Sequence, residues 1–422
     1  MSLTRSDKYI VLHNPISNEG HLDSWHILFI NMLARAGFKI IALTSDPVAI
    51  RKKFYDADQT FGDTVSQAFG QQVTVLGPEP IGLVQRGVRR LSAYLMKMRD
   101  FFLGRPKRRV THLDPRTLAQ QLNALFVRYP EKIGVVFNMY MDAYDPAPEQ
   151  WKHFRLTTAV PLVGICITPR ANRSEGYYGL SQYRGTCFLD ETWCEAYQKK
   201  FTDKYFEYLP DITDTRLPQA PSALLQQILA FTQGRKIVFM GGSIGKQKNL
   251  TGWHQTISAS DCEQWCFVQV GRINRNNLTE ADEKSLQTQA AQPSTNLFVH
   301  DGYVEDEAIF NEIISYSAVI FAVYRDFDRS SNMLSKAAYF EKPILVSPQG
   351  VMGKRVKQYK IGLCVNPDVS DEIVNGLSAI EQIPNLQENF RLYRNDFSLD
   401  VVQKKLVRFI DQSVGAPGVT KR

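Results

Sequence analysis

Short apolar runs alternate with amphipathic stretches along most of this chain. Such runs, set between polar loops that carry glycine, are typical of buried parallel strands. They lie at 9–12, 38–44, 72–76, 133–138, 163–168 and 185–190, and again at 236–240, 266–270, 296–299, 318–324, 343–347 and 361–365. Helices are expected at 25–36, 191–201, 222–231, 305–315, 332–340 and 400–410. Strands that alternate with helices predict an α/β protein with doubly wound parallel sheets.

A segment rich in proline, aspartate and threonine divides this pattern into two halves. It covers 210–221 and is typical of a linker between domains. We expect a first Rossmann-like domain over 1–212, a linker and short helix over 213–233, and a second Rossmann-like domain over 234–385. The remaining residues, 386–422, are expected to form a helix that crosses back to the first domain and a flexible tail.

Composition places the chain among ordinary globular proteins. Of its 422 residues, 44% are hydrophobic and 22% are charged. No apolar run approaches the roughly 20 residues that span a bilayer, and 1–8 is too short and polar for a signal peptide. The six cysteines have neither zinc-binding spacing nor a dense disulfide pattern, so we expect reduced thiols and a cytoplasmic protein.

One segment of the first half is strongly basic. Residues 86–109 include nine basic residues and one acidic residue. Apolar residues from Val84 to Phe102 recur at steps of four and three, which predicts an amphipathic helix near 81–102 with a cationic face. Two interpretations stay open: a helix packed on its own domain, or one that docks through 84–109 on an anionic membrane at the inner face. Nucleic acid is not an expected partner, because no recognised binding module surrounds the segment.

The loops that follow two strands of the second half have the composition of a phosphate site. The loop after 236–240 contains Gly241, Gly242, Lys246, Lys248 and Asn249. Backbone N–H groups, helix N-termini and lysines favour anions, although the loop does not match the P-loop pattern and a solvent-facing turn is the alternative. After 318–324, a polar loop delivers Ser330, Ser331 and Asn332 to the start of a helix. The loop 14–20 of the first half lacks a dinucleotide fingerprint, so no nicotinamide or flavin is expected.

Several motifs of the second half follow one another in a familiar order. They are Gly302-Tyr303-Val304, the acidic helix after it, the strand near 319–323, the serine-bearing loop, Ala337-Ala338, Lys342-Pro343-Ile344 and the glycine turn at Gly350. Over about 240–367 this order resembles the carboxyl-terminal half of GT-B glycosyltransferases, especially the retaining family 4 enzymes. The resemblance implies two Rossmann-like domains that face each other across a cleft. It also implies a nucleotide sugar as donor substrate, with no metal and no other cofactor.

The resemblance assigns roles to individual residues. Lys248-Asn249 matches the family's lysine motif that contacts the donor diphosphate, whereas Gly242 stands where the family has a partner arginine. Two family glutamates eight residues apart, facing the donor sugar and the ribose, correspond to Asp328 and Lys336. Asp328 is thus a catalytic candidate. Lys336 either meets a phosphate or is a solvated helix residue.

Further candidates lie on neighbouring loops. Arg272 and Tyr303 are expected to bind the donor, and His21 is the candidate catalytic histidine of the first domain. The acceptor side is expected to include Asn18, Gly20, Asn138, Asp142 and Arg170. The Asp-x-Asp sequence of the second half, Asp326-Phe327-Asp328, is not expected to hold a metal, since the two-domain rhythm favours GT-B.

The sequence leaves three functional readings. The preferred one is a glycosyltransferase that moves a sugar from a nucleotide sugar to an oligosaccharide, a polysaccharide precursor or a lipid-linked acceptor. A second is a catalytically degenerate GT-B protein that binds glycan or a partner glycosyltransferase, suggested by Gly242 and Lys336. A third is an enzyme of the sugar-epimerase type, for which only His300 and Asp301 offer the necessary groups.

Overall fold

The computed structural model describes residues 8–17, 22–52, 72–77, 112–144, 147–169, 176–304 and 306–415. These residues form two compact units. Unit 1 contains the described residues up to Glu207 together with those from Val407 onward, and unit 2 is Tyr208–Leu406. The predicted basic helix near 81–102 lies outside the described residues. No helix within the described ranges is long and apolar enough to cross a membrane.

Unit 1 is built on a seven-stranded sheet with the order β3-β2-β1-β4-β5-β6-β7. The strand pairs from β3 to β6 are parallel. The strands are β1 (Tyr9–Asn14), β2 (Lys39–Thr44), β3 (Val73–Leu76), β4 (Ile133–Asn138), β5 (Leu162–Cys166), β6 (Tyr183–Phe188) and β7 (Tyr205–Tyr208). The helical segments are α1 (Leu22–Arg35), α5 (Pro115–Arg128), η2 (Met141–Ala143), α6 (Pro148–Trp151), η3 (Gly176–Gly179) and α7 (Glu191–Lys200). Helix α1 ends where Gly37 adopts a φ of 86°, a left-handed conformation that suits glycine.

Unit 2 is built on a six-stranded parallel sheet with the order β10-β9-β8-β11-β12-β13. The strands are β8 (Lys236–Gly241), β9 (Trp265–Val270), β10 (Leu297–His300), β11 (Val319–Ala322), β12 (Ile344–Val346) and β13 (Gly362–Cys364). The α-helices are α8 (Ala223–Thr232), α9 (Leu250–Ala259), α10 (Glu280–Ala291), α11 (Glu307–Tyr316), α12 (Asn332–Tyr339), α13 (Gly350–Tyr359), α14 (Ser370–Ala379) and α15 (Leu386–Phe397). Short 3-10 helices occur at η4 (Lys246–Lys248), η5 (Arg275–Asn277) and η6 (Ile380–Gln382).

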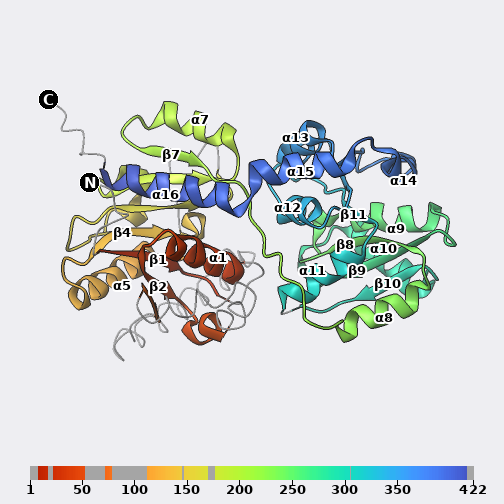
Figure 1. Cartoon of the computed structure of the whole chain (residues 1–422), viewed down its shortest axis with the longest axis horizontal. Coiled ribbons are helices and arrows are strands. Elements are labelled where there is room, and N and C mark those ends of the chain that lie inside the picture. Colours follow the sequence, from red (N-terminus) through yellow and green to blue (C-terminus); the bar gives the residue numbers. More distant parts are fainter. Residues whose placement is uncertain are drawn as a thin grey trace, which may run out of the picture. The chain divides into compact units, whose positions relative to one another are not determined.

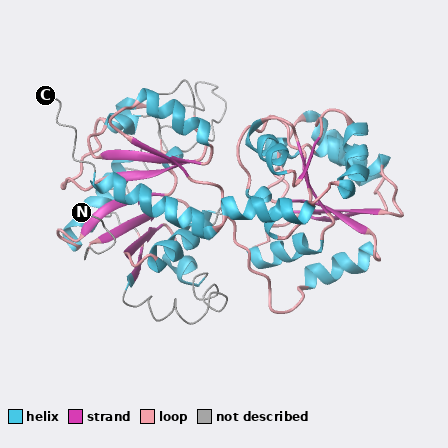
Figure 2. Cartoon of the chain, turned by 45° about the horizontal axis from the view of Figure 1, so that its top comes forward, coloured by secondary structure: helices cyan, strands magenta, loops and turns pink. Residues whose placement is uncertain are grey.

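Alternation along the strands gives this second sheet two apolar faces, and helices flank them (Figure 2). In β8, Ile237 and Phe239 belong to a core completed by residues of α8, α11, α12, α13 and α15. Val238 and Met240 belong to the opposite core, which α9 and α14 complete. Helix α10 adds only the partly buried Leu286 to that second core. The sequence prediction of doubly wound parallel sheets is therefore confirmed.

The last helix, α16 (Leu399–Gly415, blue in Figure 1), begins in unit 2 and ends in unit 1. Its Phe409 ring packs on Phe137 of β4 at 6.1 Å and on Tyr205 of β7 at 5.6 Å between ring centroids. Arg408 of the same helix pairs with Glu207 at 2.6 Å. Aromatic packing and a charge pair thus hold the carboxyl-terminal part of α16 on the first sheet.

Two predictions of local structure need correction. The segment between 347 and 361 was expected to be a loop with a glycine turn, but it contains helix α13, which starts at Gly350 with a φ of 65°. Strand β7 follows helix α7 where no strand was expected. Its buried positions, Phe206 and Glu207, include a charged residue, which breaks the apolar run that sequence patterning requires.

Candidate functional site

The order of the second sheet reverses between two adjacent strands. Strand β8 is the first strand of unit 2 and β11 is the fourth, yet they lie side by side (Figure 1). The chain leaves β8 toward β9 and β10 on one side, and leaves β11 toward β12 and β13 on the other. Ligands of open parallel sheets bind outside the carboxyl ends of the strands at such a reversal. The loops after β8 and β11 therefore form the candidate site.

Lys248 connects these two loops. Its Nζ lies 2.9 Å from the carbonyl oxygen of Gly241, the last residue of β8, and 2.7 Å from the phenol oxygen of Tyr324. The ammonium also lies 4.3 Å from the centre of the Tyr324 ring, a cation–π distance. Lys248 has three donors, of which these contacts use two. The remaining donor can serve an anion at the sheet edge.

Asn249 shapes the same loop without offering its side chain to a ligand. It is fully buried and adopts a φ of 55° as the N-cap of α9. Its side-chain oxygen accepts a bond from the N–H of Gly252 at 3.1 Å, and its amide nitrogen donates to the carbonyl oxygen of Pro367 at 2.8 Å. An asparagine tolerates this left-handed conformation better than most residues. Asn249 therefore fixes where α9 starts and where Lys248 stands.

The backbone explains why glycine occupies position 242. Gly242 has a φ of 96°, and its N–H donates to the carbonyl oxygen of Val270 at 3.0 Å. Gly271, with a φ of 139°, packs so closely that a Cβ there would overlap the Gly242 carbonyl. A side chain at position 242 would be strained in this conformation. The partner arginine of the family that the sequence resembles therefore has no equivalent on this loop.

The loop after β11 ends in the N-cap of helix α12. Ser331 caps the helix by accepting from the N–H of Met333 at 3.4 Å. Ser330 bonds to the buried carboxyl group of Asp211. Burial raises the pKa of Asp211 to about 7, an effect that the Ser330 hydrogen bond and the charge of Lys336 oppose. Ser330, Ser331 and Asn332 are all half-buried, at the carboxyl edge of the sheet.

Asp328 lies on that same loop with its carboxylate in solvent. Its side chain is 86% exposed, and Arg329 lies 3.9 Å away. Its backbone is held firmly, because its carbonyl oxygen accepts from the N–H of Val351 at 3.2 Å and its Cα would be 2.5 Å from a Cβ on Gly350. The loop is thus clamped to the start of α13 while the carboxylate stays accessible.

Lys336 neither lies in solvent nor offers a free donor. Its side chain is fully buried, so the interpretation as a solvated helix residue is wrong. The ammonium pairs with Glu307 at 2.6 Å, donates to Asn311 Oδ1, and lies 3.3 Å from the carbonyl oxygen of Asp214. These three acceptors use its three N–H donors. In this arrangement Lys336 ties α12 to α11 and has no donor left for a ligand.

The other predicted donor residues lie around the same edge. Lys246 and Arg272 are exposed, and half of the Tyr303 side chain is accessible.

The two residues that an enzyme of the sugar-epimerase type would use have different surroundings. His300 is half-buried, whereas the Asp301 carboxylate accepts a hydrogen bond from the N–H of Ile273 at 2.8 Å. Asp301 therefore shapes a loop. Among the described residues, no group of three or more His, Cys, Asp or Glu side chains is arranged to hold a metal.

Unit 1 holds the two acceptor-side candidates that the structure describes. Asn138, fully buried at the end of β4, donates to His13 Nδ1 at 3.1 Å and to the Tyr144 hydroxyl at 3.4 Å, and accepts from the N–H of Tyr140 at 2.9 Å. These contacts occupy the side-chain amide of Asn138, so Asn138 holds the end of β4 in place.

The other candidates of the first domain, Asn18, Gly20, His21 and Arg170, lie outside the described residues.

Asp142 is likewise engaged by backbone. Its carboxylate accepts from the N–H groups of Ile167 and Thr168 at 3.3 and 3.1 Å, and from the Thr168 hydroxyl at 2.7 Å. It therefore fixes the loop after β5 at the carboxyl edge of the first sheet.

Sequence reasoning missed Tyr324 and His13. Tyr324 is the last residue of an apolar run, where an aromatic ring is easily taken for core, and its hydroxyl is the only sign of a polar role. His13 lies buried near the end of β1, next to Asn138. Burial, and then the nearby His26, lowers the pKa of His13 to about 3, so the ring is neutral.

Comparison with known proteins bears on the fold. No family model and no curated protein sequence matches the chain. Solved structures do match it: a glycosyltransferase from Rickettsia africae has a TM-score of 0.63 at 11% identity, covering 97% of this chain and 99% of that chain. A UDP-forming α,α-trehalose-phosphate synthase from Burkholderia vietnamiensis has a TM-score of 0.62 at 13% identity, covering 96% and 99%. Anabaena HepE, solved in complex with UDP and glucose, has a TM-score of 0.62 at 11% identity, covering 95% and 98%.

At these identities the likeness establishes the fold alone. The chain has the GT-B fold, as the sequence resemblance implied. A place in the retaining family 4 stays a prediction.

Proposed function

We propose that this chain is a glycosyltransferase that moves a sugar from a nucleotide sugar to an oligosaccharide, a polysaccharide precursor or a lipid-linked acceptor. The observation that carries the proposal is the position of Lys248, which stands between the ends of β8 and β11 with two protein contacts. A sugar transfer of this kind releases a nucleoside diphosphate, so negative charge develops on the diphosphate. A fixed cation and nearby N–H groups stabilise that charge.

The surrounding loops supply the other groups that such a donor needs. Helix α12 points its capped N-terminus, with Ser331 and Asn332, to the same sheet edge. Asp328 is an accessible carboxylate at this edge and is proposed to face the donor sugar. Lys246, Arg272 and Tyr303 are proposed to complete the donor contacts. Two of the structurally similar proteins carry UDP in their names or complexes, so we propose a UDP-sugar as the first donor to test.

The remaining features belong to the same proposal. Transfer is proposed to be metal-independent, to retain the anomeric configuration, and to use a hexosyl donor, with His21 on the acceptor side. The basic segment 84–109 is proposed to bring the protein to an anionic membrane surface on the cytoplasmic side, where a lipid-linked acceptor would lie. Liposome flotation tests this last point: binding that ignores anionic lipid and salt would contradict it.

The proposed activity is tested with purified chain and a panel of nucleotide sugars. We expect hydrolysis or transfer with at least one sugar, and calorimetric binding of the corresponding nucleoside diphosphate. Lys248→Ala should weaken diphosphate binding by about tenfold or more, since it removes a charge-assisted contact. Lys284→Ala, on an exposed lysine of α10, is the matched control and should change neither quantity. Absence of binding and turnover across the panel would contradict the proposal.

A second candidate is a GT-B protein that binds glycan or a partner glycosyltransferase without catalysis. Two observations favour it: the left-handed glycine at position 242, where an arginine is missing, and the internal pairing of Lys336. This candidate predicts that Lys248→Ala leaves cellular glycan unchanged while deletion of the whole chain alters it.

A further inference from the structure

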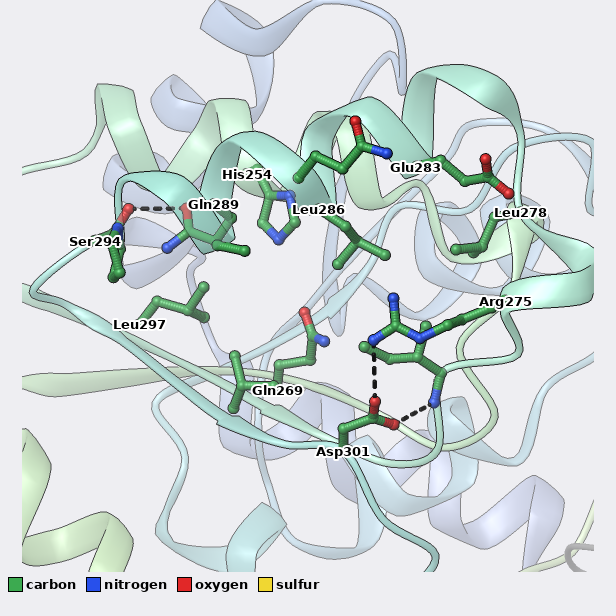
Figure 3. Close-up of a pocket in the computed structure, with 15 residues that line it drawn as sticks. His254, Gln269, Arg275, Leu278, Glu283, Leu286, Gln289, Ser294, Leu297 and Asp301 are labelled. Carbon is green, nitrogen blue, oxygen red and sulfur yellow. Dashed lines mark hydrogen bonds and ion pairs between the residues drawn. The ribbon is translucent and has the colours of Figure 1, made fainter.

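A cavity of about 530 Å³ lies in unit 2, apart from the loops after β8 and β11 (Figure 3). Helix α10 forms its roof, and strands β9 and β10 form its floor (Figure 3). Strand β10 is the edge strand of the sheet, and its Val299 is 46% exposed, so the cavity opens to solvent at that edge. Its volume falls in the range of small-molecule sites.

The cavity exists because α10 is attached by polar contacts instead of apolar packing. Leu286 is its one large apolar residue, and apart from three alanines the rest of the helix is polar. Its first turn is held by Asp282, whose carboxylate accepts from the N–H and hydroxyl of Thr251 on α9, both at 3.1 Å. Farther along, Ser285 bonds to His254 Nδ1 at 2.7 Å. These contacts hold α10 beside α9 and leave the space above the sheet unfilled.

Two buried polar side chains point into that space. Gln269 of β9 is only 1% exposed, and its Oε1 has no hydrogen-bond partner among the described residues. Its amide points from the floor toward α10 (Figure 3). A buried amide oxygen without a partner destabilises the folded protein, because it has lost its hydrogen bonds to water. A ligand that donates a hydrogen bond would recover this cost.

His254 is the second polar group, and it faces the cavity as a neutral ring. Because Nδ1 is bonded to Ser285, the other ring nitrogen is the one directed at the cavity (Figure 3). Burial lowers the pKa of His254 to about 4, against a weaker opposing effect of Asp282. The inner polar groups are thus an amide and a neutral imidazole. The charged lining residues are exposed: Arg275 and Asp301 pair with each other at 3.6 Å, and Glu283 lies on the solvent side of the lining.

Apolar side chains make up most of the remaining lining. They are Ile273, Leu278, Leu286, Ala290, Leu297 and Val299. An apolar wall with neutral hydrogen-bonding groups at the bottom matches a ligand without charge, because a buried ion would find no opposite charge there.

One wall residue of the cavity, Ile273, contacts the loop that carries Lys248. Ile273, on its wall, forms a parallel bridge with Ile244. The carbonyl oxygen of Ile244 accepts from the N–H of Asn274 at 2.8 Å, and its N–H donates to the carbonyl oxygen of Arg272 at 3.0 Å. A ligand that presses on Ile273 therefore acts on the loop after β8 through two backbone hydrogen bonds.

We propose that this cavity binds a small uncharged ligand with an apolar body and hydroxyl or amide donors, and that binding restrains the loop after β8. The binding itself is independent of the proposed transferase activity. An effect of the ligand on sugar transfer rests on that proposed activity, since Lys248 lies on the restrained loop.

The first test is a calorimetric titration of the full chain with hexyl β-D-glucopyranoside below its micelle-forming concentration. We expect saturable binding at one site. Heptanoate and hexylammonium, which carry a charge on the same hexyl chain, should bind at least about tenfold more weakly, because neither charge has a partner inside. Failure of hexyl glucoside to saturate, or equal binding of the charged homologues, would overturn the proposal.

The second test locates the ligand. Leu286→Trp fills the cavity and should abolish binding, and Gln269→Met removes the acceptor and should weaken binding about fivefold to tenfold. Leu392→Trp, at an exposed leucine of α15, is the matched control and should bind like the wild-type protein. Wild-type affinity in the folded Leu286→Trp or Gln269→Met protein would overturn the location.

If the Leu286→Trp protein does not fold, a third measurement locates the ligand. In Gln287→Cys, the introduced thiol lies at the exposed rim of the cavity on α10, and hexyl glucoside should slow its alkylation several-fold. The exposed native Cys262 is the internal control and should react at an unchanged rate. Equal rates at both positions would refute a site under α10.

The effect on the loop is measured by amide hydrogen exchange, which requires no nucleotide. Saturating hexyl glucoside should slow exchange in 242–249 and leave α15 unaffected. Unchanged exchange in 242–249 would refute the coupling. A failure to bind any nucleoside diphosphate would instead refute the proposed function, so the two outcomes are distinguishable.

Discussion

The ammonium of Lys248 lies 2.7 Å from the hydroxyl oxygen of Tyr324, although 76 residues separate them in the chain. Lys248 follows β8 and Tyr324 follows β11, so this contact bridges the reversal of strand order in the second sheet. A cation and the carboxyl ends of two parallel strands thus meet at one point. This is the physical basis for placing an anionic donor there.

Removing the tyrosine hydroxyl should loosen this cation. In Tyr324→Phe, Lys248 keeps its contact with the carbonyl oxygen of Gly241 and with the ring, but loses the hydroxyl acceptor. We expect the free energy of unfolding to fall by about 1 kcal/mol and diphosphate binding to weaken a few-fold. Urea unfolding and calorimetry measure the two effects. Tyr316→Phe, at an exposed tyrosine of α11, is the control, and equal behaviour of the two variants would refute the role of the hydroxyl.

Gly242 and Gly271, which pack against each other near Lys248, should tolerate no side chain. Gly271→Ala places a methyl group against the Gly242 carbonyl and imposes a φ of 139° on alanine. We expect a loss of more than about 2 kcal/mol in the free energy of unfolding, together with loss of diphosphate binding. Thermal unfolding checks the first expectation. Gly179→Ala has open space at its Cβ and an ordinary φ, so its midpoint should stay near that of the wild-type protein. Similar midpoints for both variants would mean that the loop relaxes freely.

The buried Lys336 should matter for folding and not for the donor. Lys336→Met leaves the Glu307 carboxylate, which is only partly exposed, without its partner, and should cost about 2–4 kcal/mol of unfolding free energy. Adding Glu307→Gln should recover part of this loss, because no unpaired charge then remains. A double-mutant cycle measures the coupling. If the folded Lys336→Met protein loses diphosphate affinity while the Glu307→Gln protein keeps it, Lys336 contacts the donor after all.

Acid should destabilise unit 1 through two buried histidines. Burial lowers the pKa of His13 to about 3 and that of His26 to about 4, from 6.5. Below pH 6.5 the unfolded chain therefore binds more protons than the folded chain, so the free energy of unfolding falls as the pH drops from 6.5 toward 4. In His26→Gln, an amide N–H can still donate to the carbonyl oxygen of Leu12 but does not titrate. We expect a shallower decline for His26→Gln.

Denaturant unfolding between pH 7 and 4 provides the measurement for this prediction. His153→Gln, at an exposed histidine, is the control and should follow the wild-type slope. A His26→Gln protein that declines as steeply as the wild type would show that His26 takes up its proton equally in the folded and unfolded states, so that burial does not lower its pKa.

The sequence predicted those parts of the fold that repeat a simple pattern. Strands such as β4 and β8 are continuous apolar runs, because helices cover both faces of a parallel sheet. Helix α13 escaped prediction because Gly350 and Gly353 interrupt it, and glycine is a poor helix former. Helix α10 has almost no apolar face and depends on Asp282 and Ser285 for its place. Such long-range polar contacts leave no periodic signal.

The candidate site was predictable in outline and not in its contacts. Lys248 could be found from its place after a strand and from the family motif. Its partner could not, because Tyr324 meets it only once the sheet order places β11 beside β8. Lys336 illustrates the opposite case: its position suggested a ligand or solvent, whereas Glu307, Asn311 and Asp214 surround it. Burial of a single charged helix residue depends on residues far away in the chain.

The most direct test of the central claim is a crystal structure of the full chain soaked with UDP. We predict a diphosphate within hydrogen-bonding distance of Lys248 Nζ, next to the N-terminus of α12 and beyond the carboxyl ends of β8 and β11. The same soak of Lys248→Ala should show the diphosphate absent or at lower occupancy. A nucleotide bound at another place, with Lys248 still held only by Gly241 and Tyr324, would contradict the account.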